Sequence, residues 1–164
     1  MANTLPIEAL QKYVRYEPDT GIVRWNGRGR LRDGRIAGTP DKDGYLCIRI
    51  EGRRFPLHRI AFALHCGYWP EVDIDHKDGD RRNNRASNLR EATRTQNNAN
   101  SKMRANNTSG LKGVHWHAAS QKWRAMIRVN RKSKCLGLYE DKYVAQDKFL
   151  AVARELYGEF CPKG

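Results

Sequence analysis

Residues 73–80 read Asp-Ile-Asp-His-Lys-Asp-Gly-Asp, and residues 87–100 read Ser-Asn-Leu-Arg-Glu-Ala-Thr-Arg-Thr-Gln-Asn-Asn-Ala-Asn. The first segment predicts a short strand that ends in a tight turn at Asp78-Gly79. The second contains Thr93-x-x-Gln96, which has the form of a capping box, so a helix is expected to begin at Arg94. This helix has almost no apolar residues, so core packing alone cannot hold it in place.

Three kinds of chemically useful side chain lie in this stretch. Asp75 is a hard oxygen ligand, His76 can act as a base near neutral pH, and Asn88 and Asn97 offer amide carbonyl oxygens. A hard cation with these ligands polarises a phosphate, while an adjacent imidazole takes the proton of an attacking water. An isolated Asp-His pair is usually a surface feature without a role, and Asn-rich runs are usually loops. It is the whole spacing that favours a site for phosphodiester hydrolysis.

The spacing also resembles that of a known family. Asn88 follows His76 by twelve residues and Asn97 follows Asn88 by nine. This pattern, with the flanking 57–61, 75–80 and 88–92 segments, resembles the HNH endonucleases in the His-Asn-Asn version of phage and intron homing enzymes. The resemblance implies that His76 is the general base, that Asp75 and Asn97 are metal ligands, and that Asn88 orients the histidine. Because Asn97 stands where many members have a second histidine, one Mg²⁺ or Mn²⁺ ion is expected rather than Zn²⁺.

The N-terminal part is expected to be β-rich. A short helix is predicted over residues 5–14, with Thr4 as its cap, and strands are predicted at residues 22–25, 44–50 and up to Phe55. A helix should open at Pro56 and stop at Gly67. A loop with glycines between its arginines is either a solvated loop or a DNA contact; its arginines are Arg28, Arg30, Arg32 and Arg35. His58 is expected to be either structural or a phosphate contact.

The C-terminal part is expected to hold three strands and a helix. Strands are predicted to begin at Gly113, to span residues 122–129 and to lie around residues 134–138, and Asp141 can cap the helix that follows. The stripe of that helix expected to cover the sheet is Val144, Ala145, Lys148, Phe149, Val152, Ala153, Leu156 and Tyr157. Trp116 is expected either to pack under the sheet or to stack on DNA, and core packing is favoured.

This C-terminal pattern resembles the AP2 DNA-binding domain. The matching residues are Gly113-Val114, the segment from Lys122 to Arg128, Leu136-Gly137 and the alanine-bearing helix. The resemblance implies that the uncovered face of the sheet enters the DNA major groove, where basic side chains contact phosphates or base edges. The positions implied are Lys112, His115, His117, Lys122, Arg124 and Arg128.

Charge agrees with a polyanionic partner. The 164 residues carry 31 Lys plus Arg against 18 Asp plus Glu, a net charge of +13. Residues 1–100 contribute 18 basic and 13 acidic residues (+5), and residues 101–164 contribute 13 and 5 (+8). Such an excess typically neutralises phosphates and releases counterions. Both parts are therefore expected to contact nucleic acid.

Other compositional features narrow the class of protein. The four cysteines form no Cys-x-x-Cys pair, so neither a zinc ribbon nor a disulfide framework is expected. No apolar run reaches transmembrane length, and no signal-peptide pattern begins the chain, which predicts a cytoplasmic protein, in a bacterial host if phage-encoded.

The expected fold is α+β. It consists of an N-terminal helix and β-rich region (1–55), a ββα-metal nuclease finger (56–102), a linker (103–110) and an AP2-like sheet packed on one helix (111–164). The expected function is metal-dependent, homing-type cleavage of double-stranded DNA, with no membrane and no obligate protein partner. A DNA-binding regulator with an inactive finger is the alternative. An RNA-binding protein is a weaker one, since the sheet lacks exposed aromatic pairs that stack on bases.

Overall fold

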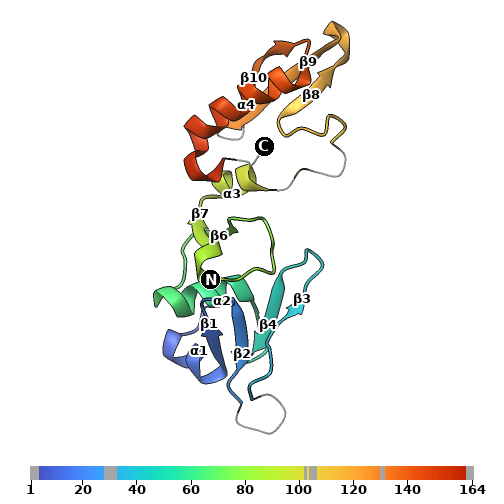
Figure 1. The fold of residues 1–164 in the computed structure, drawn as a ribbon. Coiled ribbons are helices and arrows are strands. Elements are labelled where there is room, and N and C mark those ends of the chain that lie inside the picture. The colour runs from blue at the N-terminus through green and yellow to red at the C-terminus, as the bar shows by residue number, and fades with distance from the viewer. Residues whose placement is uncertain (1–3, 28–32, 102, 104–106, 130–131, 162–164) are drawn as a thin grey trace. The chain divides into compact units, whose positions relative to one another are not determined.

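The computed structural model describes residues 4–27, 33–101, 103, 107–129 and 132–161. Three residues expected to contact DNA, Arg28, Arg30 and Arg32, lie outside the described residues. The chain forms two compact units, Met1–Ala92 and Thr93–Gly164 (Figure 1). These two units are groups of residues in contact and do not test the expected domain boundaries. The division at residues 55, 102 and 110 stays a prediction.

The first unit begins with a helix and a hairpin. Helix α1 spans Ile7–Tyr13, and strands β1 (Val14–Glu17) and β2 (Ile22–Trp25) pair antiparallel. The helix starts later than the predicted residue 5 because Pro6, not Thr4, occupies the cap position and makes no side-chain capping bond. The turn between the strands contains Gly21 at a φ of 75°, in the left-handed region that glycine adopts without strain.

A three-stranded antiparallel sheet follows, in the order β3-β4-β5. Its strands are β3 (Thr39–Pro40), β4 (Leu46–Ile50) and β5 (Arg53–Pro56). Helix α2 (Leu57–Cys66) continues directly from β5, and it ends where Gly67 takes the left-handed conformation and bonds back to Ala63. The predicted helix between Pro56 and Gly67 is confirmed.

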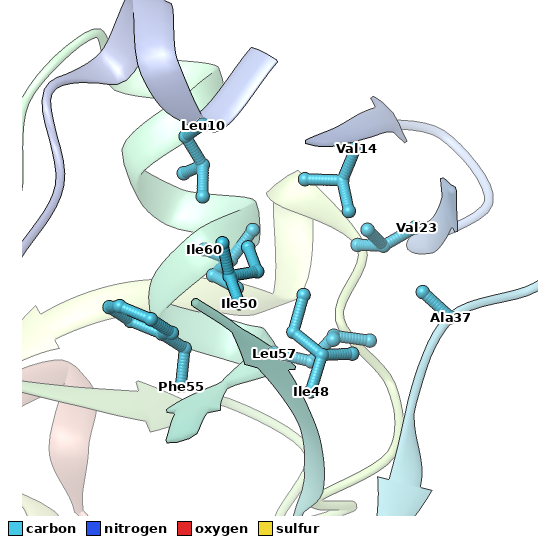
Figure 2. Packing of buried hydrophobic residues seen from close by; sticks show 9 residues of the cluster. All are labelled: Leu10, Val14, Val23, Ala37, Ile48, Ile50, Phe55, Leu57 and Ile60. Carbon is cyan, nitrogen blue, oxygen red and sulfur yellow. The ribbon is translucent and has the colours of Figure 1, made fainter. Parts of the chain in front are cut away.

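One hydrophobic core joins these elements. Figure 2 shows side chains from α1, both N-terminal sheets and α2 packed together: Leu10, Val14, Val23, Ala37, Ile48, Ile50, Phe55, Leu57 and Ile60. The α2 residues Leu57 and Ile60 therefore belong to the same core as the N-terminal elements. Helix α2 also contributes Ala61 and Phe62 to a second cluster with Ile74 and Leu89.

The last elements of the first unit are a second hairpin. Strands β6 (Asp73–His76) and β7 (Leu89–Ala92) pair antiparallel, and the short helix η1 (Ala86–Asn88) precedes β7. Through Ile74 and Leu89 this hairpin rests on α2, so the buried side of the hairpin is fixed by the core.

The second unit opens with α3 (Arg94–Asn100) and then forms a sheet in the order β10-β9-β8. The strands and helices after α3 are β8 (Val114–His117), η2 (Ala118–Ser120), β9 (Lys122–Val129), β10 (Lys132–Tyr139), α4 (Lys142–Tyr157) and η3 (Gly158–Phe160). Helix α4 covers one face of the sheet (Figure 1). The core between them is Val114, Ala125, Ile127, Ala145, Phe149 and Ala153.

Gly113 is required where the sheet meets α4. Its φ is 76°, and an added Cβ would lie 2.2 Å from Cδ2 of Phe149. Both the backbone conformation and the close approach exclude a side chain there. The expected sheet backed by one helix, and the expected cap by Asp141, are confirmed.

Two expectations about packing in this unit are wrong. Val144 and Leu156 are 52% and 47% exposed, because three strands offer a narrow surface that only part of the α4 stripe covers. Trp116 is 49% exposed at the edge of the sheet, although its ring meets that of Trp123 with centroids 5.0 Å apart. In the described part of the chain, no helix has the length and apolar character that a membrane span requires.

Candidate active site

Strand β6 delivers Asp75 and His76 to the interior. Neighbours on a strand normally point to opposite faces, yet Asp75 is 4% exposed and His76 is 5% exposed. His76 is the last residue of the strand, and its carbonyl accepts a bond from Gly79 N at 2.8 Å, which closes the expected tight turn. Because the pleat ends at His76, both side chains are covered.

Asp75 is held by an arginine across the hairpin. Arg90 is its register partner on β7, and Nε and Nη2 of Arg90 each lie 2.9 Å from Oδ2 of Asp75. Both side chains are largely buried, at 5% and 11% exposed. Charge-assisted bonds of this kind fix a carboxylate firmly.

His76 lies in a cluster of rings and amides. Its Nε2 is 3.1 Å from Oδ1 of Asn84, and its ring centroid is 5.3 Å from that of His58 and 6.1 Å from that of Tyr45. Burial lowers the pKa of His76 below its ordinary value of 6.5, although Asn84 and nearby carboxylates act in the opposite direction. The imidazole is therefore neutral near pH 7, which is the form a general base needs.

The side chain of Asn88 forms its described hydrogen bonds with Asp78 and Asn83. Its Oδ1 accepts from Asp78 N at 3.1 Å, while its Nδ2 donates to Asp78 Oδ1 at 3.0 Å and to Asn83 O at 2.8 Å. These bonds tie together the turn that follows His76. The expectation that Asn88 orients the imidazole stays a prediction, and the described amide contact of the ring is with Asn84.

His58 lies beside the ring of His76 and is partly buried. It lies on α2, its ring is 5.1 Å from that of Tyr45, and its buried Nδ1 has no hydrogen-bond partner among the described residues. Burial and the neighbouring His76 lower the pKa of His58 to about 3. His58 is thus neutral at physiological pH, and its predicted contact with phosphate stays a prediction.

Asn97 lies on α3, in the second unit. The predicted capping box is confirmed: Thr93 Oγ1 accepts from Gln96 N at 3.4 Å, and Gln96 Oε1 accepts from Thr93 N at 2.8 Å. Asn97 N donates to Thr93 O at 2.9 Å, which sets it in the first turn as expected. The structure thus gathers Asp75, His76 and Asn88 in one unit, and Asn97 remains a predicted ligand from the other.

The two predicted metal ligands are of a kind that suits a hard cation. Asp75 has a carboxylate and Asn97 an amide oxygen, and such groups suit Mg²⁺ or Mn²⁺. Among residues that the structure describes, no three or more His, Cys, Asp or Glu side chains gather as a metal cluster.

Five of the residues expected to bind DNA share the uncovered face of the second sheet. The register pairs His115 with Arg124 and His117 with Lys122, on the side opposite the Ala125–Ile127 core. Arg128 follows on the same side of β9. Nε of Arg124 is buried and has no hydrogen-bond partner within the described segments.

Lys112 and Arg35, which are also expected to bind DNA, do not lie on this sheet face. Nζ of Lys112 donates to Ala99 O at 2.5 Å and also to Ser101 O, so this lysine closes the C-terminal end of α3 instead of joining the strand face. Burial lowers the pKa of Lys112. Arg35 is exposed after β2, and its carbonyl accepts from Trp25 N at 3.0 Å.

Comparison with known proteins shows the family of the chain. A family model described as HNH endonuclease matches residues 55–99, which include Asp75, His76, Asn88 and Asn97. The chain is 34% identical over 93 residues to Protein 3.8 of Escherichia phage T7, covering 53% of this chain and 71% of that relative. The chain belongs to the HNH endonucleases. The resemblance to the HNH endonucleases is confirmed.

Two further matches involve one homing endonuclease. This HNH endonuclease is 40% identical over 57 residues to DNA endonuclease I-HmuI of Bacillus phage SP01, covering 32% of this chain and 33% of that relative. It therefore spans a third of that relative's length. A solved structure described as DNA binding and cleavage by the HNH homing endonuclease I-HmuI aligns with 93% of this chain and 90% of its own, at 22% identity and a TM-score of 0.44.

Sequence reasoning missed three residues of the site. Arg90 could have been found, because an antiparallel hairpin with this turn sets it opposite Asp75. Tyr45 comes from the β3–β4 turn, and nothing in its local sequence connects it with His76. Asn84 stands in the run Arg-Arg-Asn-Asn-Arg, where neither asparagine is distinguished from the other.

Proposed function

We propose that this HNH endonuclease is a metal-dependent, homing-type enzyme that cuts double-stranded DNA. The observation that carries the proposal is the buried Asp75-His76 pair at the end of β6, with a neutral imidazole beside a carboxylate held in place by Arg90. The name of one phage relative, DNA endonuclease I-HmuI, supports DNA as the substrate, and so does the net charge of +13.

In the proposed reaction His76 acts as the general base. The imidazole takes a proton from water as the water oxygen bonds to phosphorus, and a bridging P–O bond breaks to release one end of the strand. Asp75 and Asn97 would hold one Mg²⁺ or Mn²⁺ ion, which when bound polarises the phosphate and stabilises the departing oxygen. Arg90 fixes the orientation of Asp75, and the Asn88 bonds fix the turn after His76.

The flanking parts would supply affinity and register. A small active site cannot select a rare target by itself, so base and phosphate contacts elsewhere must do so. We assign this role to the uncovered face of the β8–β10 sheet, used in the manner of an AP2 domain, through His115, His117, Lys122, Arg124 and Arg128. The face is basic and uncovered by α4, which supports the assignment. Arg28, Arg30, Arg32, Arg35, His58 and Lys112 remain proposed DNA contacts.

The test is cleavage of supercoiled plasmid and of phage and host DNA by the purified chain, with Mg²⁺, with Mn²⁺ and with chelator. His76→Ala should lower the cleavage rate about 10²–10⁴-fold and keep DNA binding, because the base acts on water and contributes little to the grip. His65→Ala, an exposed histidine at the end of α2, is the matched control and should cut at the parental rate. Parental cleavage by His76→Ala, or full activity in excess chelator, would contradict the proposal.

A further inference from the structure

Asn84 is the most deeply buried polar side chain near the active site. It is 2% exposed, it precedes η1, and its Oδ1 lies 3.1 Å from Nε2 of His76. Its Nδ2 is buried and makes no hydrogen bond within the part of the chain that the structure describes. A buried amide with an unpaired donor destabilises a fold relative to an apolar side chain of the same shape. Its presence therefore calls for a functional explanation.

The backbone of Asn84 is clamped by the N-terminal hairpin. The hydroxyl of Tyr16, on β1, donates to Asn84 O at 2.7 Å, and Ala86 N donates to Pro18 O at 2.9 Å. Gly21 approaches so closely that an added Cβ would lie 2.7 Å from the carbonyl carbon of Asn84. With its backbone fixed from both sides, the side chain of Asn84 has a set position against His76.

We propose that Asn84 is a positioning residue that fixes the tautomer of His76. A carbonyl oxygen can only accept a hydrogen bond, so Oδ1 facing Nε2 keeps the proton on Nε2 and the lone pair on Nδ1. In the cleavage reaction, Nδ1 is then the atom that takes the proton of the attacking water. The inference rests on the proposed role of His76 as general base, and it assigns that role to one ring nitrogen.

The two neighbouring asparagines have other described partners. Asn88 is engaged with Asp78 and Asn83 through both of its polar atoms. Asn83 Nδ2 donates to Asp78 Oδ2 at 2.7 Å. The opposite orientation of Asn84, with its NH₂ group toward Nε2, would demand the other tautomer, so a direct measurement of the tautomer decides the matter.

Two substitutions of Asn84 in the full chain separate its chemical role from a structural one. Asn84→Asp keeps an acceptor oxygen at Nε2. Asn84→Leu has a similar shape but lacks the acceptor; it removes the unpaired Nδ2 but leaves Nε2 of His76 without this partner, so its melting temperature is measured to show that it folds. Asn26→Leu is the matched control, because Asn26 bonds Gln11 O through its own side chain, away from His76.

The readouts are the tautomer of His76 and the kinetics of plasmid cleavage. Long-range ¹H–¹⁵N spectra at alkaline pH, where the ring is neutral, should show the Nε2–H tautomer in the parent and in Asn84→Asp. Asn84→Leu should show a mixture of tautomers, with kcat lower by about 10–100-fold and KM unchanged. Asn84→Asp should recover most of that loss, and Asn26→Leu should match the parent.

Several results would overturn the inference. An Nδ1–H tautomer in the parent would do so directly, and so would parental kcat in a folded Asn84→Leu. If Asn84→Leu does not fold, Tyr16→Phe takes its place: loss of the hydroxyl should lower kcat at unchanged KM, and a parental kcat there would count against the proposal. If His76→Ala cuts at the parental rate, the role of His76 fails, while the measured tautomer still reports on Asn84.

Discussion

Two histidine rings packed against each other make the active site sensitive to acid. The pKa of His58 is lowered from 6.5 to about 3 by burial and by His76, and the pKa of His76 is lowered by burial. Unfolded histidines bind protons at a higher pH than these folded ones. The stability that depends on neutral rings is therefore fully present above about pH 6.5 and is lost as pH falls toward the lowered values.

The free energy of unfolding should accordingly decrease between about pH 6.5 and pH 5, by at most about 1.4 kcal/mol per pH unit for each histidine. His58→Phe keeps a ring in place and should flatten the decrease. Denaturant unfolding at a series of pH values measures both. His65→Phe, on the exposed end of α2, should leave the slope as it is. An equal slope in the parent and His58→Phe would show that His58 does not titrate in this way.

The buried pair Asp75–Arg90 leads to a second prediction. Arg90→Met would leave the carboxylate of Asp75 buried without its guanidinium, and such a loss typically costs about 3–5 kcal/mol. Arg24→Met is the control, because the Arg24–Glu17 pair is 28% and 38% exposed and should contribute less than about 1 kcal/mol. Urea unfolding compares the two. Similar losses in both variants would mean that burial does not distinguish these ion pairs.

At this scale the sequence could reveal the reactive residues but not their partners. Asp75 and His76 were identified because they are adjacent and correctly spaced from Asn88 and Asn97. The residue that meets His76, however, is Asn84. Its contact depends on a backbone held by Tyr16, which lies 68 residues away in the chain. Local sequence does not encode such a contact in any pattern.

At the scale of elements, the sequence predicts helices and strands correctly from local signals. It does not predict how much of each apolar face is buried by other elements. The Thr93 capping box, the Pro56–Gly67 helix and the strand Lys122–Val129 were all predicted correctly, since caps, turns and alternation are written within a few residues. The stripe predicted on α4 is wider than the buried one, and Trp116 is half exposed although core packing is the favoured prediction. How much of an apolar face is covered depends on the width of its partner, which is a property of the tertiary fold.

Helix α3 provides a prediction at the element scale. It is seven residues long with only Ala99 buried, so its capping box contributes a large part of its stability. Thr93→Ala should cost about 1 kcal/mol. Because α3 carries Asn97, the variant should also need more Mg²⁺ for half-maximal cleavage of plasmid.

Asp141→Ala removes the cap of α4 and is the matched control. Its helix has 16 residues and a buried stripe, so a comparable loss of stability should leave the Mg²⁺ requirement unchanged. Plasmid cleavage titrated with Mg²⁺ distinguishes the two variants. If both shift the requirement equally, or neither does, the link between α3 and the metal is not supported.

At the scale of the whole molecule, Asp75 and His76 lie in one part of the sequence, and the larger share of the excess positive charge lies in another. The unit Met1–Ala92 holds Asp75, His76 and their supports, while residues 101–164 carry a net charge of +8. The sequence indicated this asymmetry through composition alone. It could not indicate that α2 shares its core with the N-terminal elements, because Leu57 and Ile60 look the same whichever partner they pack against.

A triple substitution on the uncovered sheet face tests whether that face grips DNA. Replacing Lys122, Arg124 and Arg128 by Gln in the full chain should weaken DNA binding. It should also reduce the slope of log Kd against log salt by about 0.9 for each phosphate that the protein no longer neutralises. The control replaces Lys132, Lys134 and Lys148, exposed residues that do not lie on that face, and removes the same charge. Binding to plasmid fragments over a range of salt concentrations measures both.

Because Asp75 and His76 are untouched, cleavage by the variant with the substituted sheet face should return at low salt. Equal slopes for the two triple variants would mean that net charge, and not this face, accounts for binding.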